Sequence, residues 1–102
     1  MKPSKPKNRN QAGLYSISEL RESIDEIDTQ ILDLINRRLQ VVMQIGKIKS
    51  QKGVPIIDNG RENLLIRRLL SLNEGPIDRE ALRRIFNEII GVCREIQKTD
   101  DR

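Results

Sequence analysis

The sequence contains no histidine, no tryptophan and a single cysteine, Cys93. The lack of histidine excludes every catalytic triad that depends on His, and with one cysteine the usual zinc sites are excluded as well. We therefore expect no metal site. A lone cysteine cannot form an intrachain disulfide, which favours a reducing compartment, so we expect the protein to be cytoplasmic.

Long apolar runs are also missing. No stretch approaches the roughly 20 residues that cross a bilayer, so we expect no membrane partner. The basic N-terminus is not followed by an apolar segment, which argues against a secretory signal. Aromatic residues make up only 2% of the 102 residues. Few strand-favouring residues lie outside helical stripes, and this composition predicts one small all-α domain.

The formal net charge of +4 comes from one end of the chain. Four of the 19 basic residues lie within residues 1–16, which hold no acid, and the other 15 are balanced by 15 acidic residues. Phosphate binding needs a patch of converging charge, so we expect no nucleic-acid partner. We interpret residues 1–16 as a disordered basic tail, 17–98 as a helical domain and 99–102 as a C-terminal tail.

Apolar residues recur at alternating spacings of three and four from Ile17 to Lys52, which predicts one long helix that packs along its length. Arg38 fills the position in this stripe where an apolar residue is expected. A buried guanidinium costs several kcal/mol unless an anion meets it. That anion is either a carboxylate of the protein or a ligand, and the spacing alone leaves both open.

Breaks and caps divide the rest into two shorter helices. Gly53-Val54-Pro55 ends the first helix, for which Ser18 is the expected N-cap. Asp58 or Asn59 begins the second helix, residues 73–76 end it, and Asp78 caps the third. The expected core stripe of this third helix is Leu82, Ile85, Phe86, Ile89, Ile90, Cys93 and Ile96.

Two helices of about 15–20 residues cannot cover a stripe twice as long, and each large side chain left in water forfeits about 1.5–3 kcal/mol. The lengths therefore predict an obligate homodimer built on paired long helices. Arg38 and Lys49 lie three turns apart on nearly the same face. Arg21 is too far along the axis to join them within one chain, but it can reach the site of an antiparallel partner.

Further polar residues lie where the second helix begins and at the edge of the third-helix stripe. They are Asp58, Arg61, Glu62 and Gln97. The whole set suits a small dianion that carries a hydroxyl and an ether oxygen, and it offers no obvious nucleophile.

Four segments together resemble the all-helical AroQ class of chorismate mutases. They are L-R-x-x-I-D-x-I-D-x-x-I-L-x-L-I-x-x-R (Leu20 to Arg38), G-K-I-K (Gly46 to Lys49), P-I-I-D-N-G-R-E (Pro55 to Glu62) and F-x-x-I-I-x-x-C-x-x-x-Q (Phe86 to Gln97). The resemblance implies an intertwined dimer of three-helix chains that converts chorismate to prephenate for phenylalanine and tyrosine biosynthesis. The rearrangement is intramolecular, so no cofactor is expected.

The resemblance also implies roles for single residues. Arg21 of the partner chain and Arg38 would each bind a substrate carboxylate, and Lys49 would contact a carboxylate and the ether oxygen. Arg61 falls on a supporting arginine, Asp58 and Glu62 fall on positions that hold the ring hydroxyl, and Gln97 falls on the second donor to the ether oxygen. Cys93 replaces a serine that is frequent in the family, and because a thiol is a weaker donor we expect no strong hydrogen bond from it.

Two alternatives remain at the level of sequence. An isochorismate pyruvate-lyase uses the same scaffold, although the Asp58-to-Glu62 segment resembles the mutase more closely. A non-catalytic dimerisation or regulatory module would leave Arg38 unexplained. Association with another aromatic-pathway enzyme, such as a DAHP synthase, is a further partnership that the resemblance suggests.

Overall fold

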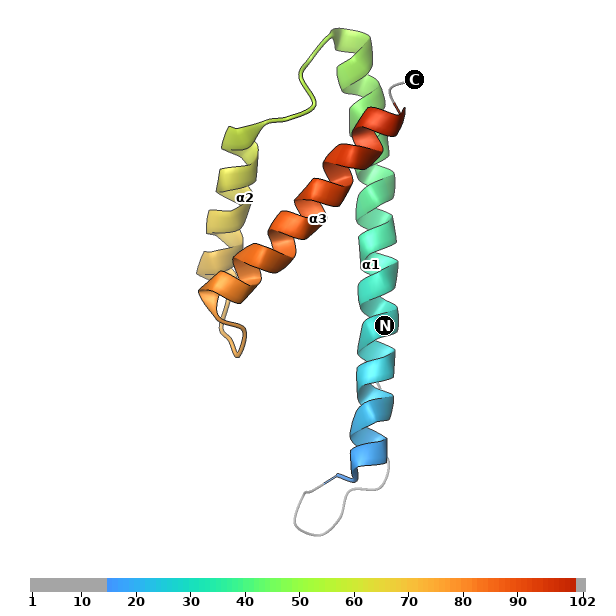
Figure 1. The fold of residues 1–102 in the computed structure, drawn as a ribbon, viewed down its shortest axis with the longest axis vertical. Coiled ribbons are helices and arrows are strands. Elements are labelled where there is room, and N and C mark those ends of the chain that lie inside the picture. The colour runs from blue at the N-terminus through green and yellow to red at the C-terminus, as the bar shows by residue number, and fades with distance from the viewer. Residues whose placement is uncertain (1–14, 101–102) are drawn as a thin grey trace. The chain divides into compact units, whose positions relative to one another are not determined.

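The computed structural model describes residues 15–100, which form three α-helices and no strand. Helix α1 comprises Ile17–Lys52, α2 Asn59–Leu72 and α3 Arg79–Asp100 (Figure 1). The all-α prediction and the long first helix are confirmed. The tail predicted at residues 1–16 lies outside the described residues except for Tyr15 and Ser16, and α3 extends through residues 99–100. Within the described range, no helix is both long enough and apolar enough to cross a membrane.

Helix α1 begins with a reciprocal cap formed by Ser16 and Glu19. The Glu19 N–H donates to Ser16 Oγ, and the Ser16 N–H donates to Glu19 Oε1, both at 3.1 Å. This capping box satisfies two backbone donors that the first turn leaves without helical partners. The assignment of Ser18 as the N-cap is therefore wrong. Ser18 already lies inside the helix, because α1 begins at Ile17.

The other end of α1 stops at Gly53, as predicted. Gly53 has a φ of 68°, a left-handed conformation that disfavours any residue with a Cβ. The Gly53 N–H donates to Ser50 O at 3.3 Å, and the Val54 N–H donates to Lys49 O at 2.8 Å. These two bonds form a Schellman motif, which turns the chain away from the helix axis and toward α2.

Aspartates cap both shorter helices. Asp58 Oδ1 accepts a hydrogen bond from the Arg61 N–H at 3.0 Å, and Asp78 Oδ1 accepts one from the Ala81 N–H at 2.7 Å. Between α2 and α3, Asn73 organises the turn, because its side chain donates to Ile77 O and accepts from the Gly75 N–H, each at 2.8 Å. The predicted boundaries of these helices are confirmed.

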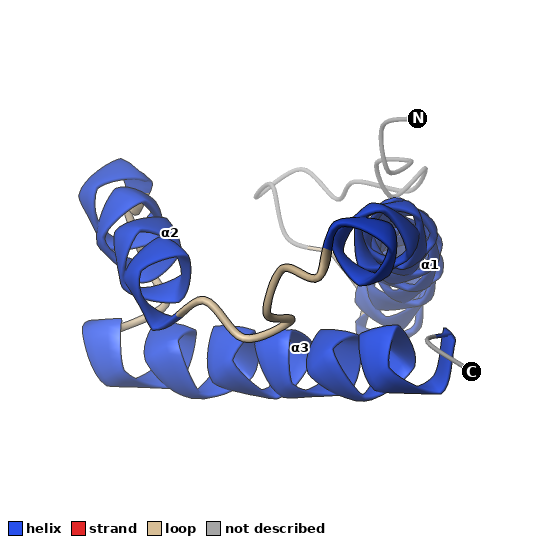
Figure 2. Cartoon of the chain, turned by 90° about the horizontal axis from the view of Figure 1, so that it is seen from above, coloured by secondary structure: helices blue, strands red, loops and turns tan. Residues whose placement is uncertain are grey.

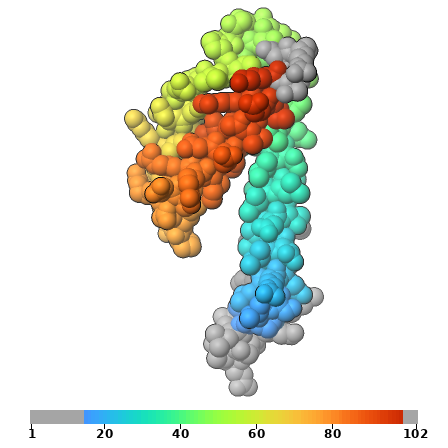
Figure 3. All heavy atoms as spheres, in the orientation of Figure 1, coloured from blue at the N-terminus to red at the C-terminus, as the bar shows by residue number. Residues whose placement is uncertain are grey.

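The chain divides into two units at Arg37–Arg38, within α1. In the second unit, α2 and the last turns of α1 lie on the same side of α3, α2 near its beginning and α1 near its end (Figures 1 and 2). Side chains fill the space between α2 and the first half of α3 (Figure 3). Helix α3 thus holds together two segments that are joined only by the loop of residues 53–58.

The core of this second unit is small. Its buried apolar side chains are Val42, Leu70, Leu82, Ile90 and Cys93. On α1 the buried positions are Val42 and Gly46, whereas Val41, Ile45 and Ile48 of the predicted stripe are exposed. A strict three-four spacing drifts around a straight helix of 3.6 residues per turn. The apolar stripe therefore no longer coincides with the face of α1 that packs against α3. Ile85 of the expected third-helix stripe is also exposed.

The first unit consists, where described, of the start of α1. Six large apolar side chains recur along one stripe of this helix, and all are at least 42% exposed: Ile17, Leu20, Ile24, Ile27, Ile31 and Leu34. The polar side chains bond locally, with Thr29 donating to Asp25 O at 2.9 Å and Arg37 meeting Asp33 at 3.9 Å. The apolar stripe that the sequence predicts is therefore intact, and it is open to solvent in a single chain.

The capping box yields a test with a matched control in the same turn. Ser16→Ala removes the side-chain acceptor and should lower the free energy of unfolding by about 1 kcal/mol. Ser18→Ala should change it by less than about 0.5 kcal/mol, because that side chain caps nothing. Urea denaturation at one fixed protein concentration measures both. Equal losses for the two variants would contradict the cap assignment.

Candidate functional site

A cavity of about 300 Å³ lies in the second unit. Its walls come from α1 between Arg38 and Lys49, the loop before α2, the first turns of α2 and the second half of α3. The polar residues that line it are Arg38, Lys49, Asp58, Arg61, Glu62, Cys93, Arg94 and Gln97. Apolar side chains complete the lining: Val42, Ile45, Ile56, Leu65 and Ile90. The cavity therefore contains four cationic groups and two carboxylates.

Arg38 projects from α1 toward α3 and is half-buried. Its Nη1 donates to the Sγ of Cys93 at 2.7 Å, and no carboxylate within residues 15–100 forms an ion pair with it. Cys93 is thus a hydrogen-bond acceptor here and not the weak donor expected from the sequence. A sulfur atom is a weak acceptor, so it leaves most of the guanidinium's capacity to bind an anion unused. Of the two anions that the sequence left open, this geometry favours the ligand.

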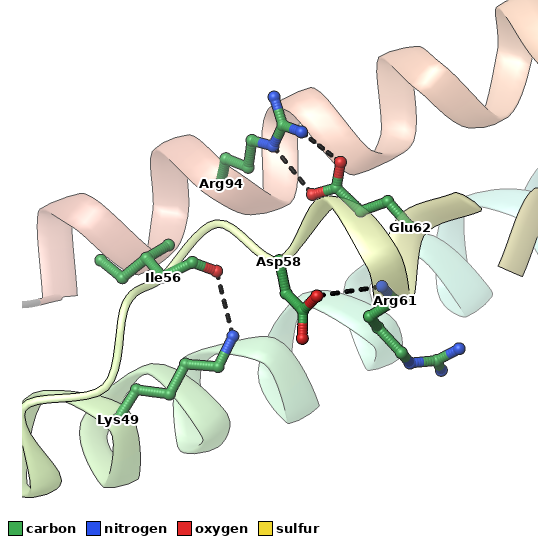
Figure 4. A network of polar contacts seen from close by, with 6 residues as sticks. All are labelled: Lys49, Ile56, Asp58, Arg61, Glu62 and Arg94. Carbon is green, nitrogen blue, oxygen red and sulfur yellow. Dashed lines mark hydrogen bonds and ion pairs between the residues drawn. The ribbon is translucent and has the colours of Figure 1, made fainter. Parts of the chain in front are cut away.

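Lys49 lies three turns further along α1 and is also half-buried. Its ammonium donates to the carbonyl oxygen of Ile56 at 3.0 Å, which ties the loop to the helix (Figure 4). An ammonium has three N–H donors. One of them therefore positions the group against the loop, and the others remain for a ligand in the cavity.

The N-cap and the first turn of α2 supply Asp58 and Arg61, respectively. The Asp58 carboxylate is engaged as the N-cap, while its residue also lines the cavity. In Figure 4 the guanidinium of Arg61 points away from Lys49 and Glu62, and the residue is exposed. No ion pair involving Arg61 forms within the described residues. Arg61 therefore adds positive charge to the rim of the cavity without a carboxylate partner.

Glu62 is paired with Arg94, a residue that the sequence analysis did not single out. Arg94 Nε donates to one carboxylate oxygen at 2.9 Å and Nη2 donates to the other, so the pair is bidentate (Figure 4). Hydrogen bonding to Glu62 raises the pKa of Arg94 above its already high ordinary value. The sequence indicates only that Arg94 lies beside Cys93 and one turn after Ile90, and so near the expected site. Its partner lies 32 residues away, however, and the pairing depends on how α2 packs on α3.

Gln97 is buried, with 9% of its surface exposed. Its Oε1 is buried and has no hydrogen-bond partner among the described residues. Gly46 makes room for this side chain, since a Cβ at that position would lie 3.3 Å from Gln97 Cγ. A buried amide without its full set of partners costs about 1–3 kcal/mol, which a bound ligand can offset.

Seven of the eight residues singled out from the sequence therefore line one cavity. The eighth, Arg21, belongs to the first unit, where it is exposed on α1. Across residues 15–100, no group of three or more His, Cys, Asp or Glu side chains is arranged to hold a metal ion. The cavity suits a small ligand with more than one negative charge, and its chemistry is that of charge and hydrogen bonding.

Comparison with known proteins adds relatives of similar size. A chorismate mutase of Methanocaldococcus jannaschii is 36% identical over 86 residues, which cover 83% of this chain and 87% of that protein. The solved structure of chorismate mutase form II from Thermus thermophilus is 30% identical, with a TM-score of 0.81. That match covers 84% of this chain and 98% of the other.

Larger relatives match as well. The bifunctional chorismate mutase/prephenate dehydratase of Aquifex aeolicus is 40% identical over 89 residues, which are 83% of this chain and 25% of that protein. The chain thus spans about a quarter of the length of such bifunctional relatives. Residues 20–98 match the profile of the family described as chorismate mutase type II. The chain belongs to the chorismate mutase type II family.

Proposed function

We propose that this protein is a chorismate mutase, which rearranges chorismate to prephenate in the biosynthesis of phenylalanine and tyrosine. The observation that carries the proposal is a cavity in which Arg38, Lys49 and Arg61 have no carboxylate partner within the described residues. Chorismate carries two carboxylates, a ring hydroxyl and an ether oxygen. Its charge complements the unpaired cations, and its size is compatible with a cavity of about 300 Å³.

The rearrangement breaks a C–O bond and forms a C–C bond within one molecule, so it needs no nucleophile and no cofactor. The protein has to hold the enolpyruvyl side chain over the ring, and Arg38 is suited to fix one carboxylate for this purpose. Negative charge grows on the ether oxygen as the bond breaks. Lys49 and the amide of Gln97 are the donors we assign to that oxygen. Asp58 and Glu62 are assigned to the ring hydroxyl.

We further propose that the working form is a homodimer in which α1 of each chain covers the exposed stripe of the other. Burying six large apolar side chains at about 1.5–3 kcal/mol each is a strong driving force for association. In such a dimer Arg21 of the partner chain would supply a second clamp for a substrate carboxylate. The name of the Aquifex relative joins a mutase to a prephenate dehydratase, which supports an aromatic-pathway enzyme as a further partner.

The neighbouring arginines of α1 offer a matched pair for testing the site. Arg38→Ala should lower kcat/KM for chorismate by at least about 10²-fold, since it removes a charged donor from the cavity. Arg37→Ala should change it by less than about twofold, because Arg37 is exposed and forms a surface ion pair with Asp33. Loss of chorismate absorbance, with prephenate identified as the product, measures both. A folded wild-type protein that leaves chorismate unchanged would contradict the proposed function, and isochorismate would be the next substrate to test.

The neutral amide of Gln97 makes a prediction about pH. Because an amide donates at every pH, the wild-type rate should be flat between about pH 5 and 8. Gln97→Glu introduces a carboxyl that donates only when protonated, and burial raises the pKa of such a group. The variant should therefore lose activity as the pH rises through that pKa and regain it in acid. A steep fall of the wild-type rate in this range would exclude Gln97 as the ether donor.

Sharing of sites between chains can be tested by mixing two inactive variants. Arg21→Ala and Arg38→Ala should each be inactive alone. A heterodimer of the two contains one site with both arginines intact and one site with neither. After co-refolding in equal amounts, random pairing should restore about a quarter of the wild-type activity. If each site used Arg21 of its own chain, the mixture would stay inactive.

A further inference from the structure

Within residues 15–100, Glu62 and Arg94 form the only ion pair between residues that line the cavity. Glu62 lies in the first turn of α2 and Arg94 on α3, and the two side chains point toward one another (Figure 4). Their side chains are 22% and 34% exposed, respectively, and both line the cavity. A bidentate pair restricts both oxygens of the carboxylate, which a single hydrogen bond cannot do.

No other cationic group of the site is bonded to Glu62 within the described residues. Lys49 donates to Ile56 O, and Arg38 donates to Cys93. Arg61 points away from Glu62 (Figure 4). Without Arg94, the Glu62 carboxylate would therefore present a negative charge with no direct ion-pair partner to the same cavity that has to accept a dianion. Like charges at close range in a partly buried site oppose binding strongly.

We propose that Arg94 is a positioning residue that cancels the charge of Glu62 and thereby lets a dianionic substrate occupy the cavity. This inference rests on the proposed function, because it takes chorismate to be the dianion. Arg94 acts through Glu62 and does not itself hold the substrate. Glu62 remains in the wall as an oriented acceptor for a hydroxyl group of the ligand.

A double-mutant cycle separates this role from direct substrate binding. Arg94→Gln alone should raise the KM for chorismate about tenfold with little change in kcat, since it exposes the Glu62 charge. In a Glu62→Gln background, the same Arg94→Gln change should alter KM by less than about twofold, because no charge is left to cancel. If Arg94 held a substrate carboxylate directly, its loss would cost the same in both backgrounds, which would overturn the proposal.

Two further variants exclude a general effect of charge or of folding. Arg84→Gln removes one positive charge from an exposed position of the same helix and should leave KM unchanged. Arg94→Lys retains the charge but cannot donate two parallel hydrogen bonds to a carboxylate. The KM of this variant should fall between those of wild type and Arg94→Gln. The tenfold rise should shrink at high salt, because screening weakens the repulsion. A purely structural role would instead lower kcat and the melting temperature together, without dependence on salt or on residue 62.

The same cycle can be run without catalysis. Calorimetric binding of a stable bicyclic dicarboxylate that mimics the compact rearranging conformer gives a Kd for each variant. If wild type binds this compound but converts no chorismate, the proposed function fails while the role of Arg94 is still tested by the pattern of Kd values. If wild type converts chorismate and Arg94→Gln leaves both KM and Kd unchanged, the role of Arg94 fails alone.

Discussion

The accumulation of positive charge in a small cavity is the constraint on which the rest of the second unit depends. Arg38, Lys49 and Arg61 line the same cavity, and none has a carboxylate partner among residues 15–100. Weak local acceptors, the Sγ of Cys93 and the carbonyl of Ile56, hold the first two in place. Such acceptors fix orientation without neutralising charge. The positive charge of Arg38 is therefore not neutralised within the described residues, as it would be by a strong internal ion pair.

The packed interior of the second unit is small, and part of it forms the wall of the cavity. The buried core of the second unit consists of five apolar side chains, and three of them also line the cavity: Val42, Ile90 and Cys93. Gly46 lets α1 approach Gln97 closely, at the cost of a glycine inside a helix. A core this small stabilises a single chain weakly. An association between two chains would bury the exposed apolar stripe of α1 and so add to this stability.

Much of the fold was predictable because helix formation and capping depend on nearby residues. The three-four spacing, the left-handed Gly53, and the caps at Asp58 and Asp78 act within one or two turns, so the sequence alone indicates them. Ser18 was misassigned because Ser16 and Ser18 compete for the same role. Only the reciprocal bond with Glu19 decides between them. Membership of the chorismate mutase type II family was equally predictable, because its motifs are spread over most of the chain.

The sequence by itself determined the helical class, the helix boundaries to within a few residues, and the set of charged residues available to a site. Tertiary structure alone decided that Val42 rather than Val41 is buried, that Cys93 accepts from Arg38, and that Glu62 pairs with Arg94. The reason is physical. Helix propensity and capping depend on neighbours within a few residues, whereas these contacts join positions 32 and 55 residues apart. They exist only once the angle and depth at which the helices pack are fixed.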